Sequence, residues 1–298
     1  MKLIVTLPAY NEEKNIGAVI RDIHTELKKH NYDYKILVVD DGSKDKTAEI
    51  SKSEGAVVIK HPMNYGLAES FKTEMKGCLG HNPDVIVHID ADGQYRAEDI
   101  PRLVGEVKKG NDLVLGSRFS GKIEYMPLIK RLGNIAFSRV VSNIIRKKLV
   151  DTQTGFRAFT KEIAKLPIIS TYTYTQEQII RAAKQKSRIK EIPVYFRKRG
   201  KGTKSRLMRN PYHYAKSAWL NLIRIYRDYE PLKFFGWPGL SFILLSIILS
   251  LRLLFNFAKR HFPLGYWDEY VPTLILIAIL IFGGLQLIFF GLLADMKR

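Results

Sequence analysis

Short apolar runs alternate with amphipathic stretches through the first 116 residues of the chain. Five of the runs have the length and composition of buried strands, and they cover residues 3–7, 35–39, 57–60, 85–89 and 113–116. Between the first two runs, apolar residues recur at helical spacing, at positions 16, 19, 20, 23 and 27. Strands that alternate with helices predict an α/β domain with a doubly wound, mostly parallel sheet.

Polar residues beside the amphipathic stretches indicate where the helices begin. Asn11 is the expected N-cap of a helix that runs to about Lys29, and Ser43 or Asp45 is expected to cap a short second helix. Further helices are expected after residues 64–66, over residues 97–109 and over residues 127–149. The first four of these helices would connect consecutive parallel strands, which need a crossover connection.

The strand at residues 85–89 ends in a pair of carboxylates. Asp90 and Asp92 are separated by one residue and are followed by Gly93. In extended chain, residues i and i+2 point to the same side, so the two carboxylates can act together. Such a pair suits a hard divalent cation that keeps some of its waters and also holds a diphosphate. The alternative is an acidic turn that caps the helix over residues 97–109.

Polar clusters also end three other predicted strands. Residues 8–12 follow the first strand, Asp40 and Asp41 end the second, and Arg118 follows the fifth. In doubly wound sheets the ligand lies outside the carboxyl ends of the strands, so clusters that share this edge predict a binding site. The sequence contains neither G-x-G-x-x-G nor G-x-x-x-x-G-K-[ST], so dinucleotide-binding and P-loop functions lack their usual support.

Two long apolar runs occupy the C-terminal third, at residues 232–257 and 271–294. Each exceeds the roughly 20 residues that a helix needs to cross a bilayer. A buried hairpin in a soluble protein is the alternative, although buried helices seldom stay apolar all round for this length. The expected organisation is a catalytic domain at residues 1–209, a juxtamembrane amphipathic helix at 210–231 and a transmembrane hairpin at 232–298.

The chain is strongly basic, with a formal net charge of +19 and a pI near 9.8. Positive residues crowd into the segment before the first apolar run: Arg197, Lys198, Arg199, Lys201, Lys204, Arg206, Arg209, Lys216, Arg224 and Arg227. Short basic flanks stay cytoplasmic. We therefore expect a multi-pass protein of the cell membrane, without a cleavable signal peptide, whose catalytic domain and termini are cytoplasmic. The single cysteine, Cys78, excludes an internal disulfide and a cysteine-based metal site.

Five motifs, in order, carry a family resemblance that covers roughly residues 1–205. They are Pro8-Ala-Tyr-Asn-Glu-Glu13, Val38-Val-Asp-Asp-Gly-Ser43, Asn64-Tyr-Gly-Leu67, Asp90-Ala-Asp-Gly-Gln94 and Asp151-Thr-Gln-Thr-Gly-Phe-Arg157. The sequence resembles the family 2 glycosyltransferases of GT-A fold, and among them the dolichol-phosphate mannose synthase group. The paired apolar runs are similar to the membrane hairpin that some members of this group carry.

The resemblance implies a nucleotide-sugar site. Pro8, Tyr10 and Glu12 would surround the base and ribose, and Asp40 would reach the base; a carboxylate accepts from the N–H groups of guanine or uracil. Asp90 and Ala91 would also bind the nucleotide. Asp90 and Asp92, with Gln94 beside them, would hold Mg²⁺ or Mn²⁺, which offsets the charge on the leaving nucleoside diphosphate. Ser43 and Asp45 are better explained by turn and capping chemistry.

The resemblance also implies an acceptor site. Arg118 and Arg131 would bind the phosphate of a polyprenyl lipid, a role suited to planar guanidinium groups. Asn134 would add a further contact, and Arg157 is a weaker candidate. An amphipathic helix that lies on lipid is the alternative reading of residues 127–149.

The basic segment at residues 196–206 departs from the family pattern. It contains Gly-x-Gly-Thr-Lys-Ser where the family has Gly-x-Ser-Lys. Arg199 and Lys204 are the candidates for diphosphate contact. A basic flank that rests on anionic lipid explains the same residues.

The expected reaction is inverting transfer of a sugar, mannose or glucose, from a GDP- or UDP-sugar to a polyprenyl or dolichyl phosphate. A polysaccharide or other glycolipid acceptor is the second hypothesis, but residues 176–181 lack the tryptophan of Gln-x-x-Arg-Trp. A membrane-tethered nucleic-acid binder and a non-catalytic scaffold are further alternatives. Since acids at the strand ends would repel phosphate, nucleic acid is not the expected partner. A homo-oligomer is compatible with the sequence, which does not specify one. His88, inside a strand, is expected to be structural.

Overall fold

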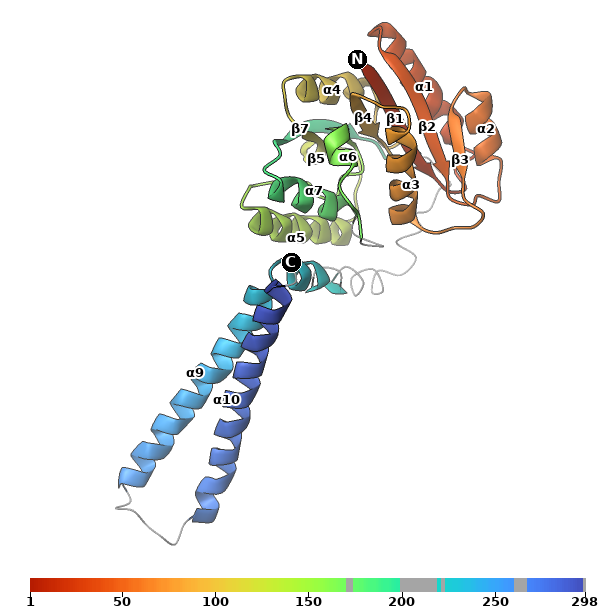
Figure 1. Ribbon diagram of the computed structural model, residues 1–298. Coiled ribbons are helices and arrows are strands. Elements are labelled where there is room, and N and C mark those ends of the chain that lie inside the picture. The colour runs from red at the N-terminus through yellow and green to blue at the C-terminus, as the bar shows by residue number, and fades with distance from the viewer. Residues whose placement is uncertain (170–173, 199–218, 221–222, 260–266, 297–298) are drawn as a thin grey trace. The chain divides into compact units, whose positions relative to one another are not determined.

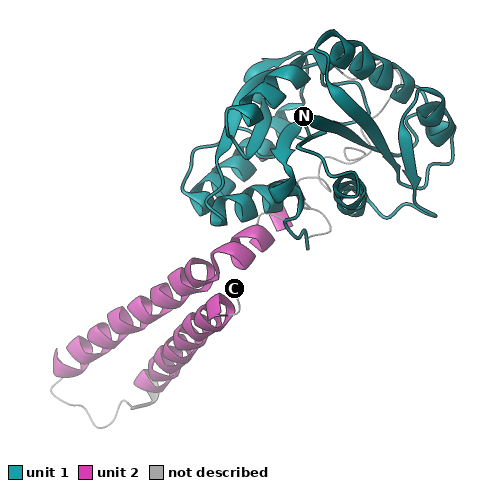
Figure 2. Cartoon of the chain, turned by 45° about the horizontal axis from the view of Figure 1, so that its top comes forward, with its two compact units in different colours: residues 1–218 teal, residues 219–298 magenta. Residues whose placement is uncertain are grey.

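The computed structural model describes residues 1–169, 174–198, 219–220, 223–259 and 267–296 (Figure 1). The chain divides into two compact units, residues 1–218 and 219–298, which are coloured separately in Figure 2. The predicted boundary between residues 209 and 210 falls outside the described residues and stays a prediction.

The first unit is built on a seven-stranded sheet of order β3-β2-β1-β4-β6-β5-β7. Its strands are β1 (Lys2–Ala9), β2 (Asp33–Asp40), β3 (Val57–Lys60), β4 (Val85–His88), β5 (Leu113–Ile123), β6 (Arg157–Thr160) and β7 (Ile189–Phe196). The five predicted strands are all present, and the pairings are parallel except those that β6 makes with β4 and β5. The mostly parallel α/β fold is confirmed.

Helices cover both faces of this sheet (Figure 1). Their bounds are α1 (Ile16–Lys29), α2 (Thr47–Ser53), α3 (Leu67–Leu79), the 3₁₀ turn η1 (Ala97–Asp99), α4 (Ile100–Lys108), α5 (Leu128–Ile145), α6 (Lys161–Ala164) and α7 (Tyr174–Lys184). The main core joins the apolar faces of α1 and α4 to alternate residues of β1 and β4, such as Val5 and Val87. Alternation places the intervening residues on the opposite face.

On that opposite face, His88 of β4 packs against aromatic rings of α3 and α7. Its ring is 5.2 Å from that of Phe71 and 5.9 Å from that of Tyr174. His88 Nδ1 lies 2.6 Å from Oε2 of Glu74, and both side chains are fully buried. His88 is therefore a core residue of the layer beneath the sheet, as expected.

Three predicted boundaries are wrong, each for a local reason. Asn11 does not cap α1: it adopts a φ of 51° and gives its backbone N–H to Ser43 Oγ, and the N-cap is Asn15. The helix over residues 127–149 ends at Ile145, because Arg146 turns left-handed with a φ of 53°. β5 continues to Ile123 through a bulge against β7, so Arg118 lies within a strand.

The second unit contains two long helices, α9 (Pro231–Lys259) and α10 (Trp267–Met296), preceded by helical residues 223–229. Both are long and apolar enough to cross a membrane, with mean hydropathies of 2.1 and 2.6. Only 6% and 22% of their most apolar stretches are buried. This exposure favours a membrane hairpin over a buried soluble one. Part of the predicted juxtamembrane helix, residues 210–231, lies outside the described residues.

The two long helices pack closely at a pair of glycines. A Cβ added at Gly284 would lie 2.8 Å from the carbonyl oxygen of Gly239, and one added at Gly239 would lie 2.8 Å from that of Gly284. Small residues at such a crossing let helix backbones approach each other in lipid. The next glycine along, Gly283, would meet only ordinary contacts with Phe242, at 3.6 Å.

We predict that Gly284→Ala weakens the hairpin although alanine favours helix. The new methyl must displace backbone, and overpacking costs about 1–3 kcal/mol. Gly283→Ala is the matched control, since it gains the same helix propensity without a clash. Thermal unfolding in detergent should therefore give a lower melting temperature for Gly284→Ala than for Gly283→Ala. Equal melting temperatures would contradict the close crossing.

Candidate active site

The acidic pair lies at the carboxyl edge of the sheet, directly after β4. Asp90 and Asp92 are both partly exposed, and Asp92 Oδ1 accepts a hydrogen bond from the Gln94 backbone N–H at 3.0 Å. Burial and the neighbouring Asp92 raise the pKa of Asp90, while His88 and Arg118 oppose the shift. The pair therefore concentrates negative charge at the point where the central strands end.

Asp90 rests against a glycine from a distant part of the chain. A methyl group added at Gly155 would lie 2.6 Å from each oxygen of the Asp90 carboxylate. Any larger residue at position 155 would push the carboxylate aside, so Gly155 forms a cradle that fits it.

The donor set suits a hard cation that brings other ligands with it. The described residues contain no group of three or more His, Cys, Asp or Glu that could hold a metal ion. Two carboxylates therefore supply only part of a coordination shell, and Mg²⁺ characteristically keeps waters and binds through one or two carboxylates plus substrate phosphates. Gln94 lies next to the pair, with its side-chain amide donating to the Arg197 carbonyl at 3.1 Å.

A second buried acid ends β2. Asp40 is fully buried, and its Oδ1 accepts from the Ser43 backbone N–H at 3.0 Å. Its Oδ2 has no hydrogen-bond partner in the described part of the chain, and Lys60 Nζ lies 3.8 Å away. An unsatisfied buried carboxylate oxygen is costly, so it marks a position where a ligand N–H would be accepted.

The neighbouring loops are held together by side chains. Asn11 and Glu12 give their backbone N–H groups to Ser43 Oγ and Thr47 Oγ1, each at 2.8 Å. Asp45 accepts from the N–H groups of Glu13 and Thr47. Ser43 and Asp45 therefore have the turn roles expected of them, and Asp45 accepts from the first N–H of α2. Neither is the N-cap residue of α2, which is Lys46. Glu12 accepts a hydrogen bond from Asn15 Nδ2 through one carboxylate oxygen. Pro8 is a buried residue near the end of β1, and the partly exposed Tyr10 follows that strand.

Asp41 organises the adjoining loop at residues 61–66. Its side chain accepts from the Tyr65 and Gly66 backbone N–H groups at 2.9 and 2.8 Å, and it lies 2.8 Å from His61 Nδ1. These contacts are all with groups of the chain itself, so Asp41 differs in role from Asp40, whose Oδ2 has no hydrogen-bond partner among the described residues.

Arg118 is buried and oriented by Asp151. The guanidinium donates through Nε and Nη2 to the two oxygens of Asp151, each at 2.7 Å, and the Arg118 backbone N–H donates to Oδ2 at 2.9 Å. Burial alone would lower the pKa of Arg118, but Tyr95 and Asp151 hold it above its ordinary value. A bidentate pair of this kind fixes the plane of the guanidinium.

Asn134 supports the same arginine. In the amide orientation that satisfies its neighbours, Oδ1 accepts from Arg118 Nη2 at 3.2 Å and the amide nitrogen donates to Gln153 Oε1. Its side chain is 1% exposed, so the structure places Asn134 behind Arg118. The direct phosphate contact expected of Asn134 stays a prediction.

Arg131 lies on the exposed, amphipathic start of α5. Leu128 and Leu132 on the same turn are 74% and 66% exposed, and Ile129 is 49% exposed. Exposed leucines beside a cation are typical of a helix at a lipid surface. The structure therefore leaves both readings of this helix open, as phosphate site and as lipid contact.

Arg157 is fully buried, which contradicts its place among the acceptor candidates. Its guanidinium donates to the Thr175 carbonyl, Gln178 Oε1 and the Thr154 carbonyl. It therefore ties the start of β6 to α7. Arg199 and Lys204, the diphosphate candidates, lie outside the described residues.

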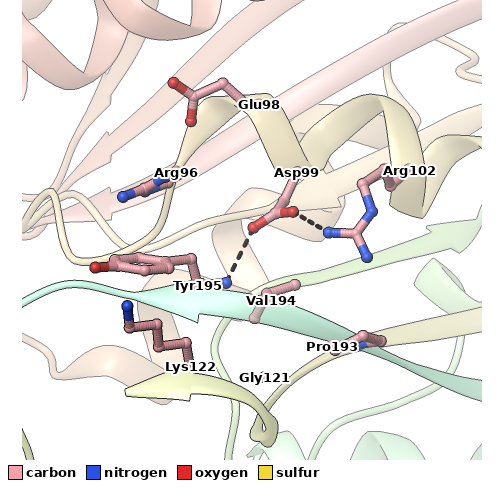
Figure 3. Close-up of a pocket in the computed structure, with 9 residues that line it drawn as sticks. All are labelled: Arg96, Glu98, Asp99, Arg102, Gly121, Lys122, Pro193, Val194 and Tyr195. Atoms are coloured by element: carbon pink, nitrogen blue, oxygen red, sulfur yellow. Dashed lines mark hydrogen bonds and ion pairs between the residues drawn. The ribbon is translucent and has the colours of Figure 1, made fainter. Parts of the chain in front are cut away.

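A separate pocket of about 540 Å³ lies beside η1, between the ends of β5 and β7 (Figure 3). The Arg96 guanidinium stacks on the Tyr195 ring, 3.6 Å from its centroid. Asp99 accepts from the Tyr195 backbone N–H at 3.2 Å and pairs with Arg102. These contacts join the segment at residues 96–102 to β7.

Sequence reasoning missed several residues that shape the site. Gly155 and Asp151 belong to a recognised motif, but their contacts with Asp90 and Arg118 were not foreseen. Glu191 was missed altogether, and it accepts from the backbone N–H groups of Val150 and Asp151. The separation of 40 residues between Glu191 and Asp151 leaves no local pattern to read.

Residues 4–166 match the family model described as glycosyl transferase family 2, which covers more than half of the chain. The chain belongs to glycosyl transferase family 2. The protein is accordingly a glycosyltransferase.

The match extends over most of the length of two relatives from this family. The UDP-N-acetylglucosamine–dolichyl-phosphate N-acetylglucosaminyltransferase of Methanococcus voltae is 33% identical over 65% of this chain and 85% of its own. The dolichyl-phosphate hexose transferase of Haloferax volcanii is 34% identical over 68% of this chain and 86% of its own.

Solved structures confirm the GT-A fold. Glucosyl-3-phosphoglycerate synthase from Mycobacterium tuberculosis, in complex with Mn²⁺, UDP-glucose and phosphoglyceric acid, superposes with a TM-score of 0.57 at 21% identity. The superposition covers 74% of this chain and 79% of the synthase. At this identity the likeness concerns the fold alone.

We predict that Asp41→Ala destabilises the first unit by roughly 2–4 kcal/mol, because it leaves the Tyr65 and Gly66 N–H groups without their acceptor. Thermal unfolding followed by circular dichroism measures the change. Asp22→Ala, at an exposed position of α1, is the control and should be neutral. Equal stability of the two variants would contradict the organising role of Asp41.

Proposed function

We propose that this glycosyltransferase moves a sugar from a nucleotide sugar to the phosphate of a polyprenyl lipid such as dolichyl phosphate. The observation that carries the proposal is the convergence, at one sheet edge, of the Asp90–Asp92 pair, the unsatisfied Asp40 oxygen and the oriented Arg118. The names of the Methanococcus and Haloferax relatives support the same acceptor class.

On the donor side, Asp40 would select the base. Its unsatisfied Oδ2 accepts one N–H, which the ring nitrogen of uracil or guanine offers. Adenine and cytosine have a ring nitrogen without a proton at the corresponding position. That nitrogen and the Asp40 oxygen are both acceptors, so no hydrogen bond would form between them. Pro8, Tyr10, Glu12 and Ala91 would line the base and ribose beside it.

Asp90, Asp92 and Gln94 would hold Mg²⁺ or Mn²⁺ together with the donor diphosphate. The fit rests on the two partly exposed carboxylates and on the Gly155 cradle that accommodates Asp90. When bound, such an ion supplies charge neutralisation to the departing diphosphate.

On the acceptor side, Arg118 would orient the lipid phosphate and Arg131 would bind it at the start of α5, with Asn134 behind. A phosphate monoester has its second pKa near 6, so the attacking oxygen is already anionic at neutral pH and needs no dedicated base. That oxygen forms a bond to the anomeric carbon while the bond to the diphosphate oxygen breaks. The bonding electrons leave with the nucleoside diphosphate, and the sugar configuration inverts.

The membrane would hold the prenyl tail. α9 and α10 would span the bilayer, and the exposed leucines of α5 would rest on its surface. The basic flanks would keep the first unit and both termini in the cytoplasm. Mannose or glucose is the proposed sugar, and the lipid-linked product would serve as a donor in glycan assembly.

A substrate panel tests the proposal. The full chain in detergent is incubated with GDP- or UDP-sugars, a short polyprenyl phosphate and Mn²⁺ or Mg²⁺, and the glycolipid product is quantified. We expect product with one nucleotide series and none after chelation of the metal. Transfer to oligosaccharide without any transfer to polyprenyl phosphate would refute the acceptor.

Asp92→Asn is the control for that panel. It keeps the shape of the side chain but removes a charge, so transfer should fall at least about a hundredfold while the melting temperature stays near that of the wild type. Full activity of Asp92→Asn would refute the metal role.

We predict that Arg131→Ala raises the KM for polyprenyl phosphate by about tenfold to a hundredfold, because a charge-assisted contact of about 1.5–3 kcal/mol is lost. The donor KM should change less than about twofold. Arg139→Ala, at an exposed position on the same helix, is the matched control. Equal losses for donor and acceptor, measured by steady-state kinetics, would argue against the assignment.

A further inference from the structure

The segment at residues 150–157 touches both halves of the site, since Gly155 lies against Asp90 and Asp151 accepts from Arg118. We propose that this segment is a brace: Gly155 sets the position of Asp90 on the donor side, and Glu191 of β7 sets the position of Asp151, and through it Arg118, on the acceptor side. The inference rests on the proposed function for the meaning of the two sides.

The sheet topology places the brace between the two groups. β6 runs antiparallel between β4 and β5, and Arg157 pairs with His88 on one side and Leu115 on the other. His88 precedes Asp90 by two residues and Leu115 precedes Arg118 by three. The chain that enters β6 therefore crosses the carboxyl ends of both neighbouring strands.

The donor end of the brace is fixed by Thr154 and Gly155. Thr154 Oγ1 donates to the Gly116 carbonyl at 2.7 Å, its Oγ1 lies 3.2 Å from the Tyr95 hydroxyl, and its carbonyl accepts from Arg157. These contacts prevent the backbone at Gly155 from retreating. The space beside its Cα is therefore a fixed seat for the Asp90 carboxylate.

The acceptor end is fixed from β7. Glu191 Oε2 accepts from the Val150 N–H and Oε1 from the Asp151 N–H, each at 2.8 Å. Asp151 is fully buried and directs both of its oxygens to Arg118. A shift of the Val150–Asp151 backbone thus moves the guanidinium directly, and misplacement by about 1 Å can cost a hundredfold in rate.

The two ends of the brace predict different defects, one in the use of the acceptor and one in the binding of the donor nucleotide. In Glu191→Gln only one oxygen remains to accept, and the new amide N–H₂ faces a backbone N–H. We expect kcat/KM for polyprenyl phosphate to fall about tenfold while nucleoside diphosphate binding changes less than about twofold. In Gly155→Ala we expect Mn²⁺-dependent binding of the nucleoside diphosphate to weaken about tenfold, with no acceptor present.

Matched controls exist for both variants. Asp112→Asn alters a carboxylate that accepts from the Arg188 backbone N–H at 2.6 Å, just before the opposite end of β5. Gly105→Ala adds a methyl on α4 where no atom lies within 4 Å. Both should match the wild type in transfer and in nucleotide binding. Melting temperatures of all four variants show whether each one folds.

The experiment uses the full chain in detergent, with UDP and GDP titrated calorimetrically in Mn²⁺ and with steady-state transfer assays. The brace is supported if folded Glu191→Gln loses mainly acceptor use and folded Gly155→Ala loses mainly nucleotide binding. Parallel loss of both functions, or no loss in either variant, overturns it. If the wild type transfers no sugar to polyprenyl phosphate, the proposed function fails, while the Gly155→Ala nucleotide titration still decides the donor end of the brace.

Discussion

The buried ion pair of Arg118 and Asp151 is the interaction on which the architecture of the site depends. Both side chains are nearly inaccessible, at 5% and 0% exposure, so each charge needs the other. Breaking a buried pair by removing one partner costs about 3–5 kcal/mol, because a charge is then left without compensation. That penalty ties β5, which carries the arginine, to the segment that leads into β6.

Because β6 is inserted antiparallel, the segment that carries Asp151 also lies next to Asp90. In an all-parallel sheet the crossovers between strands lie over the faces of the sheet. Here β6 enters from the carboxyl edge, so the residues before it pass Asp90 and Arg118 in turn. The fold therefore places a short, well-bonded segment in the position where a donor group and an acceptor group must be kept at a fixed separation.

The five parallel strands and the acidic edge could be predicted because both depend on local pattern. Buried parallel strands are apolar runs, and a ligand site lies where they end. β6 could not be found this way, since it begins with the fully buried Arg157 and only Ala158 and Phe159 of its four residues are apolar. β7 contains Pro193, which a central strand excludes but which this edge strand accommodates.

The errors within the site have a common physical origin. Asn11 is a residue type that often caps helices, yet its backbone N–H donates to Ser43 Oγ, 32 residues away. Arg157 is a residue type that often binds phosphate, yet its two terminal nitrogens donate to three acceptors inside the protein. In each case a contact between distant residues overrides a correct local preference. Only the folded chain shows which polar groups remain available to a ligand.

The same pairing determines how an anionic acceptor would be attracted. Arg118 and Asp151 together carry no net charge, so Arg118 supplies direction and little long-range attraction. The net positive charge comes from the start of α5, where Lys130 is close enough to lower the pKa of Asp90 and Arg131 is exposed. Exposed charges act mainly through steering and are screened by salt. Capture of the lipid phosphate at the membrane surface and its alignment for attack would thus be divided between two sets of residues, one exposed and one buried.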